Sequence, residues 1–365
     1  MVSKLVAATV ATVLVLGAGC RTNMGPTTIS PARFDYNQAI AASWNEQLLL
    51  NLVRLRYRDT VHFLEVSSVI TQYSLEQHAS ASAGAVFNGS TVGDVGLGAG
   101  ITYSEEPTVT FTPMNDATFA QRLLAPIPAE TLIQLAQSGW STEQLMLCCV
   151  QQVNNLQNAR SASSRAPYYV PHFEEFHRAA QLMRQLQGAG IIDMRLVKAP
   201  DDTDTTVLYL EQQPTGEWAD EVAEVWRLFG LAPGQRSYRI TSRLSGAPDE
   251  IAIIGRSLSG VLYFLSQAVK APPEDELAGK VAVTRDQSGQ AVDWNQVTGN
   301  ILNIYSQKEP PPDAFVRVFY RDHWFYIADN DLESKTTFGL VSYLFSLQAA
   351  GVEGKSPLLT VSAGR

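Results

Sequence analysis

The stretch SYRITSRLSGAPDEIAIIGRSLSGVLYFLSQAV, residues 237–269, decides the fold class. Its runs of apolar and β-branched residues predict strands over residues 237–242 and 250–254. Apolar residues at helical spacing then predict a helix over residues 257–269. Two strands followed by one helix are therefore the predicted unit of this region.

The same order of elements is predicted on both sides of this stretch. The expected strands are residues 191–197, 207–212, 315–320 and 324–328, and the expected helices are residues 218–229 and 336–348. Two of the three helices share a short pattern, YFLS at residues 263–266 and YLFS at residues 343–346. Physically, the repeat implies antiparallel strand pairs, each covered on one face by a helix.

The chain before residue 168 has a more helical pattern. Apolar residues three and four apart predict a helix over residues 36–56. Ser141 and Gln144 have the capping-box spacing of a helix that runs to about residue 157. Further helices are predicted over residues 117–124, 129–137 and 173–187.

The polar sequence SASSRAP, residues 161–167, is the predicted domain boundary. We therefore expect an α+β protein in two parts. Residues 36–160 would hold N-terminal helices with a long Gly/Ala/Ser-rich β-hairpin. Residues 168–365 would form a domain of repeated strand-strand-helix units with mostly antiparallel sheet.

The first 20 residues have the pattern of an export signal. Lys4 is followed by a short apolar run over residues 5–16 and by three small residues, 17–19, directly before Cys20. The run is shorter than the roughly 20 residues that a membrane-spanning helix needs. Residues 1–19 are therefore predicted to be a cleaved signal peptide.

The small residues before Cys20 resemble the lipobox of bacterial lipoproteins. This resemblance implies that Cys20 becomes the new N-terminus and carries acyl chains, palmitate among them, which hold the protein to a membrane. The match departs from the usual pattern at Gly17, where a leucine is usual; Leu16 lies one position earlier. Two or more acyl chains make such an attachment stable.

The residues after Cys20 bear on location. Residues 20–35 are polar, with Gly and Pro, and are predicted to be the lipidated cysteine and a flexible tether. Arg21 stands where an aspartate is the usual signal for retention in the inner membrane. The resemblance therefore implies a lipid-anchored protein of the outer membrane that faces the periplasm.

Charge and cysteine content exclude several classes of protein. The net charge of −9 argues against nucleic acid as a partner and against electrostatic binding to anionic lipid. Besides Cys20 the chain has only Cys148 and Cys149, so it has no disulfide framework. We expect these two to be small apolar residues of a helix.

Residues 69–104 predict the long β-hairpin. Over residues 93–103 one phase of the alternation is mostly apolar and the other is small or polar, and a similar alternation precedes the turn signal Asn88-Gly89. The two apolar phases share one face only if the loop has an odd number of residues, so a loop of three or five is predicted. Two interpretations stay open: a soluble hairpin packed on the N-terminal helices, or a strand pair that several chains contribute to one outer-membrane assembly.

Five blocks of the chain resemble segments shared by a family of bacterial envelope lipoproteins to which no activity is assigned. They are residues 44–60 (WNEQLLLNLVRLRYRDT), 63–69 (FLEVSSV), 107–114 (PTVTFTPM), 256–269 (RSLSGVLYFLSQAV) and 323–338 (HWFYIADNDLESKTTF). The resemblance spans most of the mature chain. It supports the envelope location and implies no activity.

Two glycine-containing sequences approach known motifs without matching them. GRSLSG at residues 255–260 lacks the glycine that a nucleophile elbow needs two residues after its serine. Ser257 is therefore predicted to cap a helix. GLGAG at residues 96–100 is followed by a predicted strand, whereas a phosphate loop needs a helix there.

Histidine and acidic residues also form patterns without the required spacing. His172 and His177 are five residues apart around Glu174 and Glu175, and a zinc-binding helix needs a spacing of four. We interpret them as surface residues of a helix. Asp329, Asp331 and Glu333 lack the glycine and later glutamate of a calcium loop and are predicted to complement a helix N-terminus, and Asp201, Asp202 and Asp204 to form a solvated turn.

We predict no catalytic, cofactor-binding or metal site, no cofactor, and Cys20 as the one modified residue. The expected function is that of a non-enzymatic, membrane-anchored envelope lipoprotein that binds a protein partner or scaffolds an assembly. One alternative is an oligomeric outer-membrane assembly or pore component that uses the 69–104 hairpin. Another is an enzyme with a dispersed site, because catalytic groups need only converge in space.

Overall fold

The computed structural model describes residues 24–83, 95–114, 117–159, 173–198, 204–210, 216–243, 246–286 and 288–349. Cys20, the Asn88-Gly89 turn signal and the predicted boundary at residues 161–167 lie outside these ranges. So do His172, Asp201 and Asp202. The chain divides into two units, Met1–Gln47 and Leu48–Arg365.

Helix α2, Met24–Tyr57, begins in the first unit, where most of its described side chains are exposed. The helix starts 12 residues before the predicted residue 36, so residues 24–35 are helical, although the sequence predicts a flexible tether there. Pro26 lies in the first turn, where a missing N–H costs nothing, and Pro31 removes one intrahelical hydrogen bond. Extending an existing helix is much easier than starting one, and composition alone does not show this effect.

In the second unit, α2 becomes a core element, with Leu48, Leu49, Leu52 and Val53 almost completely buried. Leu48 and Leu52 are among the apolar positions at helical spacing that predicted the helix. No helix in the described ranges is long and apolar enough to cross a membrane.

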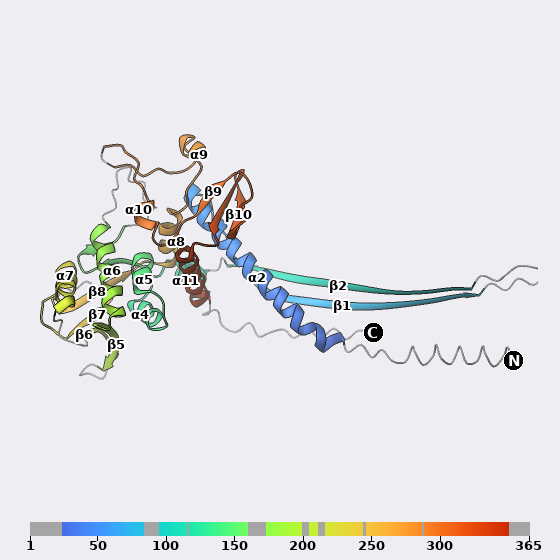
Figure 1. Cartoon of the computed structure of the whole chain (residues 1–365), viewed down its shortest axis with the longest axis horizontal. Helices are drawn as coiled ribbons and strands as arrows, with labels where there is room; N and C mark the ends of the chain where they lie inside the picture. The colour runs from blue at the N-terminus through green and yellow to red at the C-terminus, as the bar shows by residue number, and fades with distance from the viewer. Residues whose placement is uncertain are drawn as a thin grey trace, which may run out of the picture. The chain divides into compact units, whose positions relative to one another are not determined.

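In the described part of the chain, the largest sheet has six strands in the order β4-β3-β8-β7-β6-β5. Their bounds are β3 Val150–Val153, β4 Leu156–Gln157, β5 Ile192–Lys198, β6 Asp204–Leu210, β7 Ser237–Thr241 and β8 Glu250–Gly255. Strands β5 to β8 of this sheet are labelled in Figure 1. All neighbours are antiparallel except β7 and β8. The described part of the chain is thus mixed α and β with predominantly antiparallel sheet, as predicted.

The β7–β8 pair corrects one detail of that prediction. These strands run parallel, with Arg239 opposite Glu250 and Thr241 opposite Ala252, where an antiparallel pair is expected. The antiparallel neighbour of β8 is β3, which comes from far earlier in the chain. An apolar pattern is the same for either strand direction, so it cannot show which pairing forms.

Four helices accompany this sheet. They are α4 Ala129–Gln137, α5 Thr142–Cys149, α6 Glu174–Gly188 and α7 Ala219–Phe229, the last preceded by the short 3-10 helix η1 Gly216–Trp218. The predicted helix over residues 141–157 is half wrong, because α5 ends at Cys149 and the chain continues as β3 and β4. Pairing of β3 with β8 stabilises this segment more than further helical hydrogen bonds would. Asn154, between β3 and β4, has the positive φ of a turn residue. Cys148 and Cys149 are buried at the end of α5, as expected.

The second unit also contains a three-stranded sheet of order β10-β11-β9. Further elements of this unit are α3 Ala117–Leu124, α8 Leu258–Ser266, α9 Pro273–Leu277, α10 Asn295–Thr298, β9 Tyr305–Gln307, β10 Ala314–Tyr320, β11 His323–Ala328 and α11 Leu332–Ala349. Its core includes Phe345, whose ring lies 4.5 Å from that of Phe63 and 6.3 Å from that of Phe119. Along the chain, α7 follows β5 and β6, α8 follows β7 and β8, and α11 follows β10 and β11.

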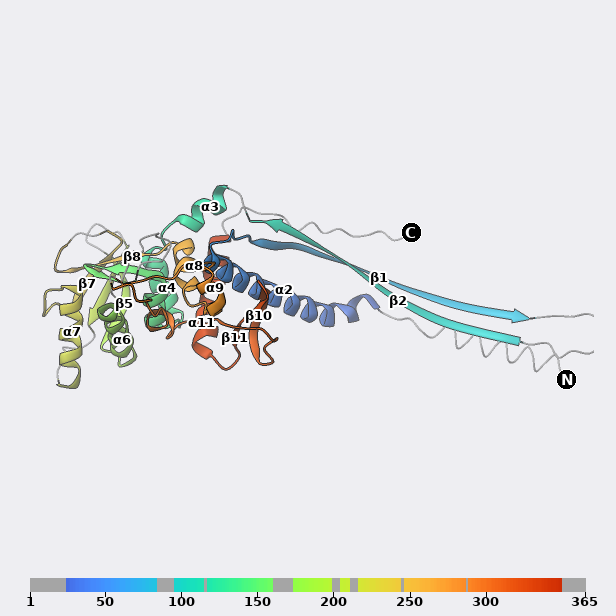
Figure 2. The same cartoon turned by 90° about the horizontal axis from the view of Figure 1, so that it is seen from above.

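Strands β1, Leu64–Ala83, and β2, Val95–Pro113, pair with each other and lie side by side over their whole length (Figures 1 and 2). Among the described residues, neither of them pairs with a third strand. We call this two-stranded sheet the ribbon. It runs antiparallel from the Leu64–Pro113 pair to the Ala83–Val95 pair, with one register shift at Ser67. Residues 96–100 lie within β2, so the sequence GLGAG is part of a strand, as predicted.

Candidate functional site

Ser257 caps a helix and does not form a nucleophile elbow. Its hydroxyl accepts a hydrogen bond from the Gly260 N–H at 3.0 Å, directly before α8. Gly255 is required for a different reason: a Cβ there would lie 2.1 Å from the carbonyl oxygen of Ile127. Both residues thus serve the fold, and the prediction for Ser257 is confirmed.

The acidic residues before α11 also have structural partners. Asp331 accepts hydrogen bonds from the Ser334 N–H at 3.0 Å and from the Ser334 hydroxyl at 2.7 Å. Asp329 pairs with Lys335 at 2.7 Å. These contacts confirm that Asp331 complements the helix N-terminus, as predicted.

His177 lies on α6 with its ring 5.0 Å from that of Phe173. Burial lowers the pKa of His177, although Glu143 and Glu174 oppose the effect. Among the described residues, its buried Nε2 atom has no hydrogen-bond partner, and no three His, Cys, Asp or Glu side chains gather as a metal site would require. His172 lies outside the described ranges, so the pattern that it forms with His177 is not described.

Arg256 forms a buried polar centre that the sequence analysis missed. Its guanidinium donates hydrogen bonds to the carbonyl oxygens of Leu147 and Cys148, each at 2.9 Å, and to that of Ala159. The group also lies 4.0 Å from the centre of the Phe264 ring. The only sequence signal is a charged residue between two apolar segments.

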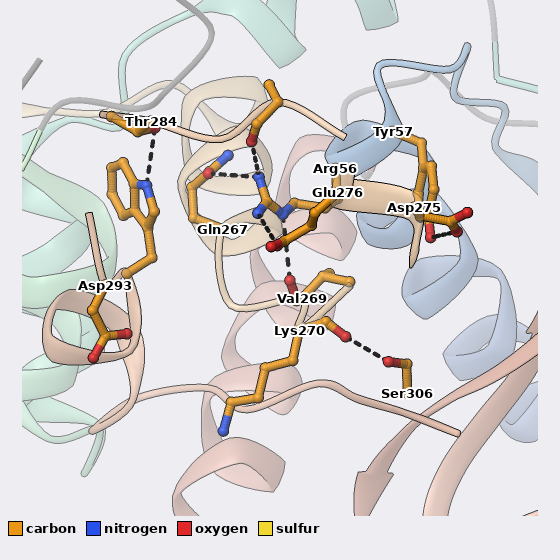
Figure 3. A network of polar contacts seen from close by, with 12 residues as sticks. Arg56, Tyr57, Gln267, Val269, Lys270, Asp275, Glu276, Thr284, Asp293 and Ser306 are labelled. Atoms are coloured by element: carbon orange, nitrogen blue, oxygen red, sulfur yellow. Dashed lines mark hydrogen bonds and ion pairs between the residues drawn. The ribbon is translucent and has the colours of Figure 1, made fainter. Parts of the chain in front are cut away.

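A polar cavity of about 260 Å³ lies beside Arg56. Figure 3 shows the polar contacts that surround the Arg56 guanidinium. The Arg56 guanidinium donates to the carbonyl oxygens of Ala282 at 2.7 Å and Val269 at 3.3 Å, and to the Gln267 side chain at 3.4 Å. It also pairs with Glu276 at 3.6 Å.

Burial lowers the pKa of Arg56, and the Glu276 carboxylate opposes this shift. Because the charge of Arg56 is already compensated by protein groups, the cavity has little excess charge with which to hold an ion. The Lys270 side chain points away from the guanidinium (Figure 3) and lies 4.3 Å from the centre of the Tyr305 ring. We interpret the Arg56 network as a structural junction between α2 and residues 267–282.

A second polar cluster fixes the end of α2. The Asp275 carboxylate accepts hydrogen bonds from the Tyr57 hydroxyl at 2.7 Å and from Lys280 at 2.6 Å. Burial raises the pKa of Asp275, but these hydrogen bonds outweigh it and the net pKa is lowered. Burial and the hydrogen bond to Asp275 raise the pKa of Tyr57.

An apolar cavity of about 50 Å³ lies between the six-stranded sheet and helices α4 and α5. Its lining includes Leu132, Leu145, Met183, Ile240 and Ile251. With so small a volume and such apolar walls, it is a packing defect of the core, and an empty apolar cavity of this kind stays dry.

The ribbon exposes an apolar surface at its described base. Leu64, Ile70, Val109 and Phe111 are 43%, 39%, 40% and 54% exposed. In the register Leu64 lies opposite Pro113 and Val69 opposite Val109, which places Leu64, Val109 and Phe111 on one face. Ile70 lies opposite Thr108, on the other face. Contiguous exposed apolar residues on a sheet commonly mark an interaction surface. The ribbon is therefore the best candidate functional region in the described part of the chain.

Comparison of the chain with models of known protein families, with curated proteins and with solved structures finds no match.

Proposed function

We propose that this protein is a lipid-anchored envelope component that works by binding other protein chains through the ribbon, and not by catalysis. The exposed apolar base of the ribbon carries this proposal. Val109 and Phe111 are two residues apart on β2, so both side chains lie on the same face. A protein partner that covers this face would remove their apolar surface from water, which favours association.

The edges of the ribbon support the same function. In the described part of the chain, neither outer edge pairs with another strand. Unpaired strand edges present rows of N–H and C=O groups, and addition of a strand from another chain is a recurring mode of recognition. The ribbon can therefore offer both main-chain and apolar contacts to a partner.

Two finer features of the fold belong to this proposal. We take β1 and β2 to be the two arms of one hairpin closed near Asn88-Gly89. The antiparallel register supports this, since it ends at Ala83 and Val95 with an odd number of residues between them. We also take three segments, β5-β6-α7, β7-β8-α8 and β10-β11-α11, to be units with the same order of two strands and one helix. Their strand pairing differs, because β7 and β8 run parallel.

The anchor is the second part of the proposal. Acylation at Cys20 would hold the protein on the periplasmic side of the outer membrane, where the partner would be found. The signal-like sequence before Cys20 supports this location. Labelling with palmitate should be lost in Cys20→Ala, and a wild-type protein that takes up no label would contradict the anchor.

Photo-crosslinking tests the binding function. A photoreactive amino acid replaces Val109 or Phe111 in the full chain, and illumination of intact cells should give an adduct with a second protein chain. Leu277 in α9 is the control position, because it is 90% exposed but far from the ribbon in sequence. No adduct at either ribbon position, or an equal yield at position 277, would overturn the proposal.

A further inference from the structure

We infer that the partner of the ribbon is the ribbon of other copies of this chain, and that several ribbons close into a ring that crosses a lipid bilayer. This inference rests on the proposed function, since it names the bound chain and the environment of the bound surface. It is carried by three observations: the register of the ribbon, the length of its apolar face and the state of its edges.

The register places the apolar positions of both strands on one face. Leu75 pairs with Tyr103, Ala81 with Leu97 and Ala83 with Val95. Positions between them on the same face are Gln77 and Ala79 on β1 and Ala99 and Ile101 on β2. The ribbon has nine consecutive pairs from Leu75–Tyr103 to Ala83–Val95, and every second pair lies on this face. Gln77 is the one residue with a polar amide among them, so this face is compatible with lipid over the length of the nine pairs.

The opposite face has small or polar positions along the same nine pairs. It contains Glu76, His78, Ser80 and Ser82 on β1, and Gly96, Gly98, Gly100 and Thr102 on β2. Such an alternation, apolar on one face and water-compatible on the other, is expected of strands that separate lipid from a water-filled interior.

The length of the apolar face matches a bilayer. Nine residues in a strand extend about 30 Å, and a tilt of about 40° reduces the height to about 23 Å. This is close to the apolar band of about 25 Å in membrane proteins made of strands. The first charged position on the apolar face is Glu105, opposite Tyr73, so charge appears where the headgroup region would begin.

The unpaired outer edges of β1 and β2 indicate which chains lie next to the ribbon in the membrane. In hydrocarbon every backbone N–H and C=O needs a hydrogen-bond partner, so one ribbon with two open edges cannot cross alone. A second copy provides a β2 edge for the open β1 edge of the first, and repetition of this contact around an axis leaves no open edge. About eight strands form the smallest such closed ring, and each copy contributes two, so we expect at least about four copies.

Fluorescent labelling tests which face meets lipid. Single cysteines at Leu97, Gly98, Ala99 and Gly100, in a chain with Cys148→Ala and Cys149→Ala, carry a polarity-sensitive dye. The full lipidated protein is reconstituted in vesicles of phosphatidylethanolamine and phosphatidylglycerol. Dye at positions 97 and 99 should emit as in hydrocarbon and be quenched by a quencher on the acyl chains, whereas dye at 98 and 100 should report water.

A matched pair of charge variants tests the pore. Ala79→Arg places a charge at the middle of the apolar face, and Ser80→Arg places the same charge on the opposite face one residue away. Arginine on the lipid face at mid-bilayer should reduce release of a trapped dye at least about 30-fold. Ser80→Arg should keep the release of dye, and both variants should unfold in urea like the wild type, since the ribbon is a sheet of its own.

The possible results separate this inference from the proposed function. A water-like dye signal at all four positions, or equal dye release by Ala79→Arg and wild type, would overturn the membrane ring. If crosslinks at Val109 and Phe111 then join a different protein, the binding function stands and only the ring fails. Light scattering in detergent should give a particle of at least about four copies. If the protein is a monomer in detergent although its crosslinks in cells join it only to other copies of the same chain, the closed ring is contradicted.

Discussion

Arg256 shows how a single residue can hold separate segments together. Its guanidinium joins the end of α5 at Leu147 and Cys148 to Ala159. We expect Arg256→Met to lower the free energy of unfolding by about 3 kcal/mol, because the buried carbonyl oxygens of Leu147, Cys148 and Ala159 each lose a hydrogen bond and only that of Leu147 keeps a second donor, the Asn158 amide. Urea unfolding measures this change, with Arg195→Met as the control, since Arg195 forms an exposed pair with Asp193 that is worth about 1 kcal/mol or less.

Ser257 tests the difference between a cap and a nucleophile. Removal of the hydroxyl in Ser257→Ala should cost about 1 kcal/mol of stability, because the Gly260 N–H loses its acceptor. Ser257→Asp should restore most of the loss, since aspartate is also a good cap. Thermal unfolding of the three proteins decides the matter: equal stability of wild type and Ser257→Ala would show that the hydroxyl has another role.

Asp275 makes the attachment of α2 sensitive to acid. Its folded pKa lies below the ordinary value of 3.8, so the ionised carboxylate stabilises the fold above that pH. This contribution is lost as the pH falls from about 4 through the folded pKa. The wild type should therefore lose stability more steeply than Asp275→Asn between about pH 5 and pH 2.5, as measured by urea unfolding at each pH.

The Asp275 prediction has a matched control. Glu130→Gln removes an exposed carboxylate on α4 and is the control for the loss of one acidic group at a surface position. Parallel curves for wild type and Asp275→Asn over the same pH range would show that the Tyr57 and Lys280 contacts do not stabilise the charged form.

At the scale of elements, the register of the ribbon is the feature to test. Ala79 lies directly opposite Ala99, and Gly98 is the next residue along β2, opposite Ser80. Cysteines at positions 79 and 99 should form a disulfide under mild oxidation, because facing strand positions meet the distance that the bond needs. Cysteines at 79 and 98 lie on opposite faces and should not.

Cysteines at positions 79 and 98 provide the control for this register. If the 79–98 pair forms the disulfide as readily as the 79–99 pair, the strands slip by one residue. A slip of that kind would move one apolar phase to the other face. It would therefore remove the basis of the membrane inference.

At the scale of the whole molecule, one sheet joins both sides of the predicted domain boundary. Strands β3 and β4 precede residues 161–167, and β5 to β8 follow them. We therefore expect a fragment of residues 168–365 to lack a cooperative unfolding transition, because it loses β3 beside β8 and the acceptors of Arg256. A fragment of residues 24–365 is the control, and a cooperative transition in the shorter fragment would establish it as a domain.

The sequence by itself determined the local elements. Helices α3 and α4 lie at the predicted residues, and β7, β8 and α8 lie close to the strands and the helix predicted within residues 237–269. Caps at Ser141 and Ser257 follow from residue type and spacing alone. These features depend on neighbours within a few positions, and the amino-acid pattern contains that information directly.

Only the tertiary structure decided how distant segments meet. The end of α5 at Cys149 and the buried Arg256 depend on contacts between residues about a hundred positions apart, such as Val150 with Gly255. The β7–β8 pair joins strands that are close in the chain, but its parallel direction is not specified by their apolar pattern. The apolar pattern of a strand does not specify which strand will lie beside it or in which direction. The presence of an arginine likewise does not predict that carbonyl groups of distant segments will accept its hydrogen bonds. The fold chooses among these arrangements by burying apolar surface and satisfying polar groups over the whole chain at once, which no short stretch of sequence can express.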